Sequence, residues 1–217
     1  RNAYKRVSDL HDVERFQSVP LYAPDDLSAP ERYGRDGSLV RVARKDSTDM
    51  VDIDPIYIGG RWTTNSKYVK ILSDSTVFRR VAFVDVTNQN IATLEKSDDG
   101  KWLVRSMNPA TTGIHNPPYA HETPTGIFVV QEKKEKMYYL HDGTSDVAGY
   151  APFASRFCNG AYIHGVPTNS RTAPIIEYSY TLGTTPRSHM CVRNASSHAE
   201  FVFKWATVLS SLVIVIE

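Results

Sequence analysis

Near its C-terminus the chain reads SHMCVRN, residues 188–194, and this stretch holds one of the chain's two cysteines. His189 lies two residues before Cys191, and Arg193 and Asn194 follow closely. A thiol becomes a nucleophile when a nearby base or positive charge favours its thiolate. Residues i and i+2 of an extended strand share one face, so His189 and Cys191 point the same way if the stretch is extended. Cys191 is therefore a candidate nucleophile, metal ligand or buried thiol.

A second histidine stands at the end of an apolar run, in YIHGVP, residues 162–167. Gly165 lets the backbone turn directly after His164, and its carbonyl can hold the imidazole. A cysteine, a histidine base and a third group that orients the base are the minimum for acyl transfer through a thioester. A helix beginning at Asn194 would add positive potential near Cys191. The residues alone thus suggest acyl transfer.

Three alternatives remain open on the residues alone. Zinc is one, because His164, His189, Cys191 and Cys158 are all possible ligands, although their spacing matches no familiar CxxC-based pattern. A Cys158–Cys191 disulfide would disable the thiol. A buried structural cysteine is the commonest fate of the residue type, and for Cys158 it is the preferred interpretation.

The bulk composition is typical of a globular protein with its own core. Of the 217 residues 41% are hydrophobic and 23% charged, so neither a metal nor a disulfide is required for folding. The net charge is +1 and there is no long basic run, so we expect no nucleic-acid partner. The most apolar run, residues 212–216, is far shorter than the roughly 20 residues that span a bilayer; we expect a buried final strand and no membrane span.

Strand signals dominate, because β-branched and aromatic runs lie between Gly and Pro turn markers. We expect an N-terminal β module over residues 1–72 and a main β domain over residues 73–217. The module's expected strands are 19–22, 39–42 and 68–71. The main domain's expected strands are 80–86, 91–95, 102–104, 126–131, 136–140, 162–165 and 212–216. The charged cluster 133–136 is expected at the tip of a hairpin between the fourth and fifth of these.

One helix is expected, directly after the SHMCVRN loop. Asn194 is a favourable N-cap residue. The residues that repeat on one face at helical spacing are Ala195, Ala199, Val202, Trp205, Ala206 and Leu209. We expect this face to pack into the core rather than to bind a ligand.

Four motifs in the main domain carry a family resemblance. IHGVP (163–167) followed by LGTTPRSHMCVRN (182–194) resembles the active-site signature of the L,D-transpeptidase family with the YkuD-type catalytic domain. Residues 81–113 are similar to the opening hairpins of that family, and HETPTGIFVV (121–130) is similar to its Thr-Pro-x-Gly strand entry. The resemblance covers about residues 78–217. It implies a mainly β, sandwich-like catalytic domain with one helix after the cysteine loop.

The end of the N-terminal module, residues 59–72, resembles the last turn and strand of a bacterial SH3-like barrel. An N-terminal β extension that packs on the main domain is the alternative. The chain begins at Arg1 with no initiator Met and no apolar leader, so we expect a mature form from which a signal or anchor has been removed. With the family resemblance, this implies the bacterial cell envelope, in the periplasm or at the outer face of the cytoplasmic membrane.

The resemblance implies a reaction on peptidoglycan stem peptides without a cofactor or metal. The thiolate attacks the carbonyl of the residue at stem position three and expels the terminal D-Ala. An amine of a neighbouring stem then takes the acyl group and gives a 3→3 cross-link. Water as the acceptor gives an L,D-carboxypeptidase, and a non-catalytic wall-binding scaffold is the alternative of a different class. Carbapenem-type β-lactams are expected to acylate the nucleophile. The oligomeric state is left open.

The resemblance also implies residue roles. Cys191 is the nucleophile, and His164 is the general base with the Gly165 carbonyl orienting its other nitrogen. His189 lines the pocket, where it hydrogen-bonds the substrate or assists the thiol. The remaining implied roles are an oxyanion hole from the backbone N–H groups of Met190 and Cys191, a substrate carboxylate partner in Arg193, and loop support from Ser188 and Asn194.

Two departures from the family pattern stand out. Met190 occupies a position where the family usually has Gly, which permits a positive φ and close backbone approach; we expect the Met side chain to narrow or cap the pocket. His164 and His189 are also separated by more residues than is usual. The extra residues fall in 168–181, where Ile176, Tyr178 and Tyr180 alternate, so we expect an added strand or the edge of a lid.

Overall fold

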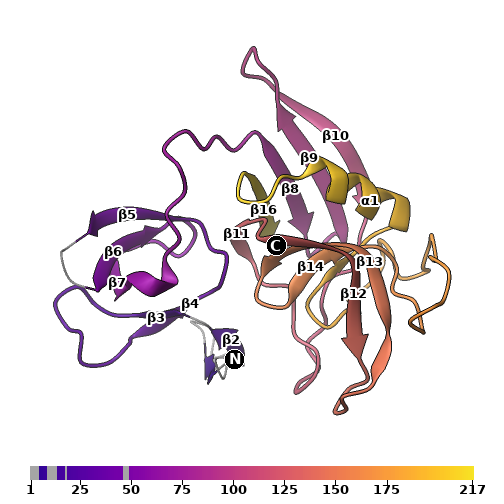
Figure 1. Ribbon diagram of the computed structural model, residues 1–217, viewed down its shortest axis with the longest axis horizontal. Helices are drawn as coiled ribbons and strands as arrows, with labels where there is room; N and C mark the ends of the chain where they lie inside the picture. The colour runs from indigo at the N-terminus through magenta and orange to yellow at the C-terminus, as the bar shows by residue number, and fades with distance from the viewer. Residues whose placement is uncertain (1–4, 9–13, 18, 46–48) are drawn as a thin grey trace. The chain divides into compact units, whose positions relative to one another are not determined.

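The computed structural model describes residues 5–8, 14–17, 19–45 and 49–217. It forms two units, residues 1–76 and 77–217 (Figure 1). The sequence predicted the boundary after residue 72. Among the helices of the described residues, none has both the length and the apolar character needed to cross a bilayer.

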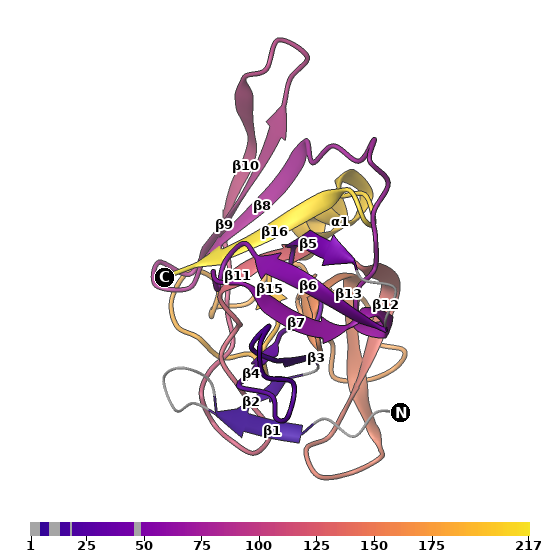
Figure 2. The same cartoon turned by 90° about the vertical axis from the view of Figure 1, so that its left-hand side faces the viewer.

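Unit 1 consists of short antiparallel strands (Figure 2). Its elements are β1 (Lys5–Ser8), β2 (Glu14–Gln17), β3 (Val19–Leu21), β4 (Arg32–Gly34), β5 (Val40–Lys45), β6 (Met50–Pro55), β7 (Trp62–Asn65) and the 3₁₀ helix η1 (Ser66–Tyr68). Alternate residues of β6 are buried, as expected for a strand with one face on a core. Leu21, Val51 and Ile53 form that core. The SH3-like assignment of this unit stays a prediction.

The strand predicted over residues 68–71 is wrong. Asn65 ends β7, and its side chain accepts a hydrogen bond from the Lys67 N–H at 3.1 Å. This local bond favours a helical turn over an extended chain, so residues 66–68 form η1 and the chain leaves it without pairing into a sheet.

Unit 2 contains two β-sheets and an α-helix. The elements of the first sheet are β8 (Arg80–Asp85), β9 (Asn90–Lys96), β10 (Trp102–Pro109), β11 (Gly126–Val129) and β16 (Ser211–Ile216), in the order β10-β9-β8-β16-β11. Those of the second are β12 (Glu132–Leu140), β13 (Val147–Cys158), β14 (Ala161–His164) and β15 (Val192–Arg193), in that order. The helix is α1 (Ser196–Trp205).

A single apolar cluster joins these layers. Both sheets and α1 contribute to it: Ala82, Val84, Ile91, Ala110, Phe128, Val130, Phe157, Cys158, Ala161, Ile163, Val192, Val202, Ala206, Val213 and Val215. The run 212–216 is the buried last strand that the sequence predicted, lying between β8 and β11. The expected mainly β fold with one helix after the cysteine loop is confirmed for the described residues.

The predicted hairpin around residues 133–136 is wrong. β11 pairs with β16 and not with the strand that follows it. Residues 132–140 form one continuous strand, β12, which pairs with β13, and the turn comes later, at residues 141–146. The charged side chains of this stretch do not require a turn, because Lys134, Glu135 and Lys136 are exposed on the strand and Lys133 bonds carbonyl groups at the end of α1.

The helix begins later than predicted. Its N-cap is Ala195, whose methyl side chain cannot accept a cap bond. The side chain of Asn194, the predicted cap, instead bonds His198 Nδ1 at 2.7 Å. The helix ends at Trp205, and Leu209 lies beyond it with a φ of 64°. The predicted extra strand in residues 168–181 is absent from this described segment; only an isolated bridge between Val166 and Ile176 forms.

Candidate active site

Two short neighbouring strands position the candidate catalytic side chains. β14 and β15 pair in parallel, with Ile163 opposite Val192 and His164 opposite Arg193. Ile163 and Val192 are buried in the core. Because side chains alternate along a strand, His164 and Arg193 point to the other face of the sheet, and Cys191, two residues before Arg193, shares that face if the alternation extends to it. The register therefore sets Arg193 opposite His164 and brings the end of the Cys191 loop next to β14.

The buried imidazole of His164 has a defined tautomer. Its Nδ1 lies 2.6 Å from the Gly165 carbonyl oxygen. A carbonyl can only accept, so Nδ1 carries the proton and Nε2 keeps its lone pair. Burial is the main cause that lowers the His164 pKa to about 4; the Gly165 bond opposes the shift and the charge of Arg193 adds to it. His164 is thus a neutral base at neutral pH.

Cys191 is a free thiol next to this base's strand. The residue is partly exposed, and desolvation by the surrounding protein is the main cause that raises the pKa of the Cys191 thiol to about 11. The Tyr162 backbone N–H and the charge of Arg193 act in the opposite direction. The S–H group donates to the Gly160 carbonyl oxygen at 3.5 Å. The resting state is therefore a neutral thiol beside a neutral imidazole.

Arg193 is the cation of the site. Its backbone N–H and carbonyl each bond Thr111 at 2.9 Å, so the main chain is fixed between β14 and Thr111. Its side chain is partly buried, and its Nε has no hydrogen-bond partner among the described residues. An unpaired buried donor is costly. This guanidinium is thus suited to an incoming anion.

The loop that precedes Cys191 is held by a polar frame. Ser188 is buried; its N–H donates to the Thr112 carbonyl at 2.9 Å and its hydroxyl donates to the Cys191 carbonyl. Thr123 Oγ1 accepts from the Gly113 N–H and donates to the Met190 carbonyl, both at 2.8 Å. The predicted loop support from Ser188 agrees with these contacts.

Met190 has a φ of 145°, in the region that favours glycine. The family's Gly would adopt this backbone without strain, whereas a Cβ makes it unfavourable. The Met190 side chain is partly buried and packs against the main apolar cluster. The Met190 Cα also lies 2.8 Å from the position that a Cβ on Gly113 would occupy. The backbones of residues 113 and 190 therefore pack directly against each other. Narrowing of the pocket by Met190 stays a prediction.

His189 does not bond the thiol. Its imidazole is exposed, and Nε2 lies 3.1 Å from both carboxylate oxygens of Asp142, in the turn between β12 and β13. Residues 188–191 lie outside β15, and the positive φ of Met190 interrupts the alternation that would place His189 on the face of Cys191.

Asn194 connects the end of β14 to α1. Its N–H donates to the His164 carbonyl at 2.9 Å, and its side chain bonds His198 on α1. The other ring nitrogen of His198 lies 2.9 Å from Ser106 Oγ, which in turn lies 2.6 Å from Thr93 Oγ1. This buried chain of hydrogen bonds links the end of the β14–β15 pair to the first sheet.

Several supporting residues were missed from the sequence. Gln89 is buried; its carbonyl oxygen accepts from the Thr112 N–H at 2.9 Å and its amide donates to Thr112 Oγ1 at 2.6 Å. Thr123 and Asp142 were likewise not assigned a role. Gln89, Thr112 and Thr123 lie inside the motifs that carried the family resemblance. The resemblance therefore included these residues but gave no physical reason for them.

The sequence had left a disulfide, a metal site and a buried structural cysteine as alternatives. Cys158 and Cys191 do not form a disulfide with each other, and Cys158 is fully buried in the core, as predicted. Within the described ranges there is no group of three or more His, Cys, Asp or Glu side chains placed to hold a metal ion.

Comparisons with known proteins identify the family of unit 2. The profile of the YkuD family, described as the L,D-transpeptidase catalytic domain, matches residues 79–215. No curated protein matches the chain. Among solved structures, an L,D-transpeptidase from Mycobacterium smegmatis is 17% identical with a TM-score of 0.50, over 98% of this chain and 88% of that one. At this identity the likeness concerns the fold.

Two further structures are similar. L,D-transpeptidase 3 from Mycobacterium tuberculosis, in complex with a faropenem-derived adduct, is 17% identical with a TM-score of 0.48, over 87% of this chain and 72% of that one. A fused Zn-dependent amidase/peptidase and peptidoglycan-binding protein from Clostridium acetobutylicum is 15% identical with a TM-score of 0.46, over 66% of this chain and 55% of that one, so the match spans about half of that protein. The family profile covers well over half of the chain, and the chain therefore belongs to the L,D-transpeptidase family, with the YkuD-type catalytic domain at residues 79–215.

Proposed function

We propose that the chain forms 3→3 cross-links in peptidoglycan through a cysteine acyl-enzyme on tetrapeptide stems. The observation that supports this proposal is the β14–β15 register, which sets Arg193 opposite His164, whose Nδ1 is held by Gly165, with Cys191 two residues before Arg193. A nucleophile and a base whose tautomer is fixed by a third group are the minimum for acyl transfer through a thioester, and Arg193 adds a cation that can bind a carboxylate.

The proposed first step starts from neutral groups. His164 Nε2 takes the thiol proton as Cys191 Sγ attacks the carbonyl carbon of the residue at stem position three. The tetrahedral intermediate then collapses; its C–N bond breaks and His164 returns the proton to the amine of the leaving D-Ala. In the second step the amine of a neighbouring stem attacks the thioester carbonyl and His164 takes its proton. The C–S bond of the second tetrahedral intermediate then breaks, and His164 returns the proton to Cys191 Sγ, which regenerates the thiol.

Charge that develops on the carbonyl oxygen needs donors. The Met190 N–H is 3.3 Å from Ser188 Oγ, whereas no described residue accepts from the Cys191 N–H. We assign the oxyanion hole to these two N–H groups; one such donor is typically worth roughly 3 kcal/mol in the transition state. Arg193 binds a stem carboxylate through its planar fork.

We assign supporting roles to the remaining residues. Ser188 and Asn194 hold the loop and the strand end, and Met190 shapes the wall beside the nucleophile. His189 contacts the substrate from the rim, since its imidazole is exposed and tied to Asp142. The peptidoglycan substrate further suggests export to the bacterial envelope, with unit 1 as an SH3-like module.

The test is mass spectrometry of purified disaccharide-tetrapeptide after incubation with the chain. We expect dimers that have lost one D-Ala, and none with Cys191→Ala. Tripeptide monomer alone, again absent in the variant, would identify an L,D-carboxypeptidase instead. Unchanged substrate in both samples, with tetrapeptide stems of either common third residue, would contradict catalysis and favour the scaffold hypothesis.

Two histidine variants separate the proposed roles. His164→Gln should abolish dimer formation, whereas His189→Gln should keep it with a raised KM, because only His164 is assigned the proton transfer. Equal loss in both variants would contradict this assignment.

A carbapenem should add its mass to Cys191, as measured by intact-mass and peptide mass spectrometry. An adduct on Cys158, or no adduct, would count against Cys191 as the nucleophile.

A further inference from the structure

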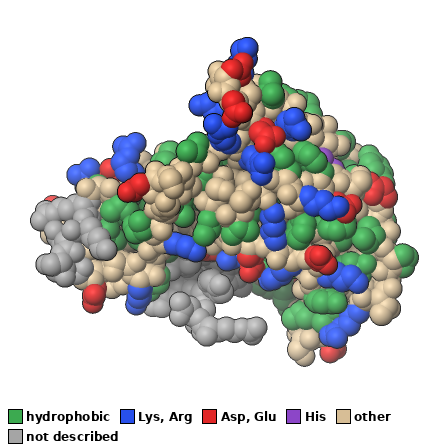
Figure 3. All heavy atoms as spheres, turned by 45° about the horizontal axis from the view of Figure 1, so that its top comes forward, with side chains coloured by type: hydrophobic (Ala, Val, Ile, Leu, Met, Phe, Trp, Pro, Cys, Tyr) green, Lys and Arg blue, Asp and Glu red, His purple; other side chains and the backbone are tan. Residues whose placement is uncertain are grey.

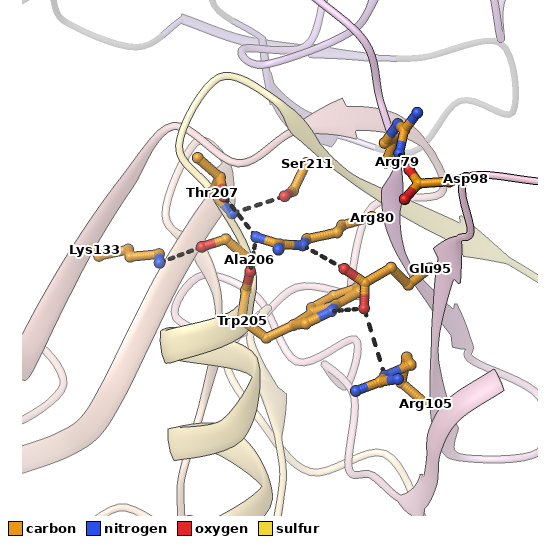
Figure 4. Close-up of polar contacts among 10 residues, drawn as sticks. All are labelled: Arg79, Arg80, Glu95, Asp98, Arg105, Lys133, Trp205, Ala206, Thr207 and Ser211. Carbon is orange, nitrogen blue, oxygen red and sulfur yellow. Dashed lines mark hydrogen bonds and ion pairs between the residues drawn. The ribbon is translucent and has the colours of Figure 1, made fainter. Parts of the chain in front are cut away.

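An open cavity of about 510 Å³ lies outside the candidate active site, where β9 ends and β10 begins. Its volume is in the range of small-ligand sites. The lining residues are Val77, Arg79, Arg80, Glu95, Lys96, Ser97, Asp98, Leu103, Arg105, Thr207 and Ser210. They come from four stretches of unit 2, and Figure 4 shows several of their side chains converging.

Positive charge exceeds negative charge in this cavity. Four basic side chains and two acidic ones line it, an excess of two, whereas the whole chain carries only +1. The excess is therefore a local feature and does not follow from a basic composition. In the space-filling view, basic and acidic side chains gather on the projecting part of the molecule (Figure 3).

Glu95 fixes the basic side chains in place. Its carboxylate accepts from Arg80 Nε at 3.0 Å and from Trp205 Nε1 at 3.2 Å, and it pairs with Arg105 Nε at 3.5 Å. These contacts occupy both carboxylate oxygens. Glu95 thus orients the guanidinium groups of Arg80 and Arg105. Because both of its oxygens are already bonded, it is poorly placed to pair with a further cation.

Many donors remain available for a ligand. Arg79 uses Nη1 on Asp98 at 2.5 Å, and Arg105 uses Nε on Glu95. No described residue accepts from the other guanidinium nitrogens of these two arginines or from Lys96 Nζ. The side chains of Arg79 and Arg105 are 51% and 50% exposed, so these donors are within reach of a ligand from solvent.

Arg80 has a structural duty and fewer donors to offer. Its Nη1 donates to the Trp205 carbonyl at 2.8 Å and to Thr207 Oγ1 at 3.0 Å (Figure 4). Since Thr207 Oγ1 accepts this bond, its own hydrogen can point to a ligand. The cavity therefore offers hydroxyl as well as cationic donors.

We propose that this cavity binds a phosphate group, carried by a lipid headgroup or by a phosphodiester polymer. Guanidinium forks suit both carboxylate and phosphate. Donors from the starts of β8 and β10, from the end of β9 and from residues 207–210 surround the cavity on several sides, and a tetrahedral anion can accept from several directions where a planar carboxylate accepts in one plane. The proposal is independent of the acyl-transfer chemistry.

The first test is calorimetric titration of the full chain with pyrophosphate at constant ionic strength. We expect binding that weakens at least tenfold in the double variant Arg79→Gln, Arg105→Gln. The control variant Arg171→Gln, Lys204→Gln removes the same charge from other surfaces of unit 2 and should bind within twofold of the unmodified chain. Cys191→Ala should bind equally well. Absence of binding, or equal weakening in both double variants, would overturn the proposal.

The second test distinguishes the sources. A lipid source predicts co-sedimentation with vesicles of phosphatidylglycerol in phosphatidylcholine, not with phosphatidylcholine alone, and its loss in the Arg79, Arg105 variant. A polymer source predicts that soluble poly(glycerol phosphate) binds with the same dependence on these arginines. If the unmodified chain binds neither carrier, the proposal is wrong even if free pyrophosphate binds.

Discussion

At the scale of single residues, the candidate site combines a neutral thiol, Cys191, with a neutral imidazole, His164. Burial raises the pKa of Cys191 to about 11 and lowers the pKa of His164 to about 4. Between these values the thiol keeps its proton and the imidazole keeps its lone pair. Free thiolate is therefore scarce at neutral pH, and the proposed mechanism requires His164 to take the thiol proton during the attack on the substrate.

This state predicts the pH dependence of alkylation. The rate of Cys191 modification by iodoacetamide should rise about tenfold per pH unit from pH 7 to pH 9 and level off only near pH 11, because the thiolate is the reactive form. Peptide mass spectrometry separates Cys191 from Cys158. Arg193→Gln should slow the reaction, since the Arg193 charge lowers the thiol pKa. A plateau below pH 8 would instead indicate a thiolate–imidazolium pair.

Gly165 is a second determinant at this scale. A Cβ there would stand 2.6 Å from Ser196 Oγ and 2.8 Å from Pro152 Cγ, closer than atoms can approach. Its carbonyl also fixes the His164 tautomer. Only a residue without a side chain fits between α1 and β13 at this point.

We expect Gly165→Ala to lower the free energy of unfolding by about 1–3 kcal/mol, the usual cost of overpacking, and to reduce kcat by more than tenfold. Urea denaturation and the cross-linking assay measure the two effects. Gly160→Ala is the control for stability, because nothing lies within 4 Å of a Cβ at that position. Equal stability of the two variants would refute the packing argument.

At the scale of elements, the C-terminus of α1 is capped by cations from two sheets. Lys133 on β12 donates to the carbonyls of Phe203 and Ala206, and Arg80 on β8 donates to that of Trp205 (Figure 4). The last carbonyls of a helix have no partner within it and carry partial negative charge. These contacts hold α1 against both sheets.

Lys133→Met should therefore reduce the free energy of unfolding by about 1–2 kcal/mol, since it removes charged hydrogen bonds but keeps the length of the side chain. Lys204→Met removes an exposed pair with Glu200 on the same helix and should cost less than about 0.5 kcal/mol. Urea titration measures both. Equal effects would show that the cap contributes no more than a surface ion pair.

At the scale of the whole molecule, two buried histidines make stability depend on pH. Burial lowers the pKa of both His164 and His198 to about 4, below the unfolded value of about 6.5. Between these values the unfolded chain binds protons that the folded chain does not. Their contribution is present above pH 6.5 and is lost as the pH falls toward 4.

We expect the free energy of unfolding of unit 2 to fall by about 1.4 kcal/mol per pH unit for each histidine over this window. Urea denaturation at pH 7, 6 and 5 measures the slope. His198→Gln should remove about half of it, because Gln does not titrate. An unchanged slope in this variant would mean that carboxylates rather than histidines control the acid limb.

The sequence determined much of this protein by local rules. Alternation predicted β8, β9 and β14, and the apolar run at the end predicted β16, because a buried strand needs such a pattern wherever it pairs. The HG and SHMCVRN motifs gave His164 and Cys191 as the candidate base and nucleophile, since that chemistry depends on residue type, and their roles stay predictions. The expectations that need more than residue type, such as a pocket narrowed by Met190 and an SH3-like unit 1, stay predictions.

Only the tertiary structure decided what partners each segment has. β11 pairs with β16 across more than eighty residues, and β12 continues through its lysines because it pairs with β13 along its length, which no local pattern reveals. Asn194 turned to His198 instead of capping α1, and His189 turned to Asp142. The physical reason is that pairing, burial and hydrogen-bond partners are set by contacts between distant segments, whereas propensity and spacing act within a few residues.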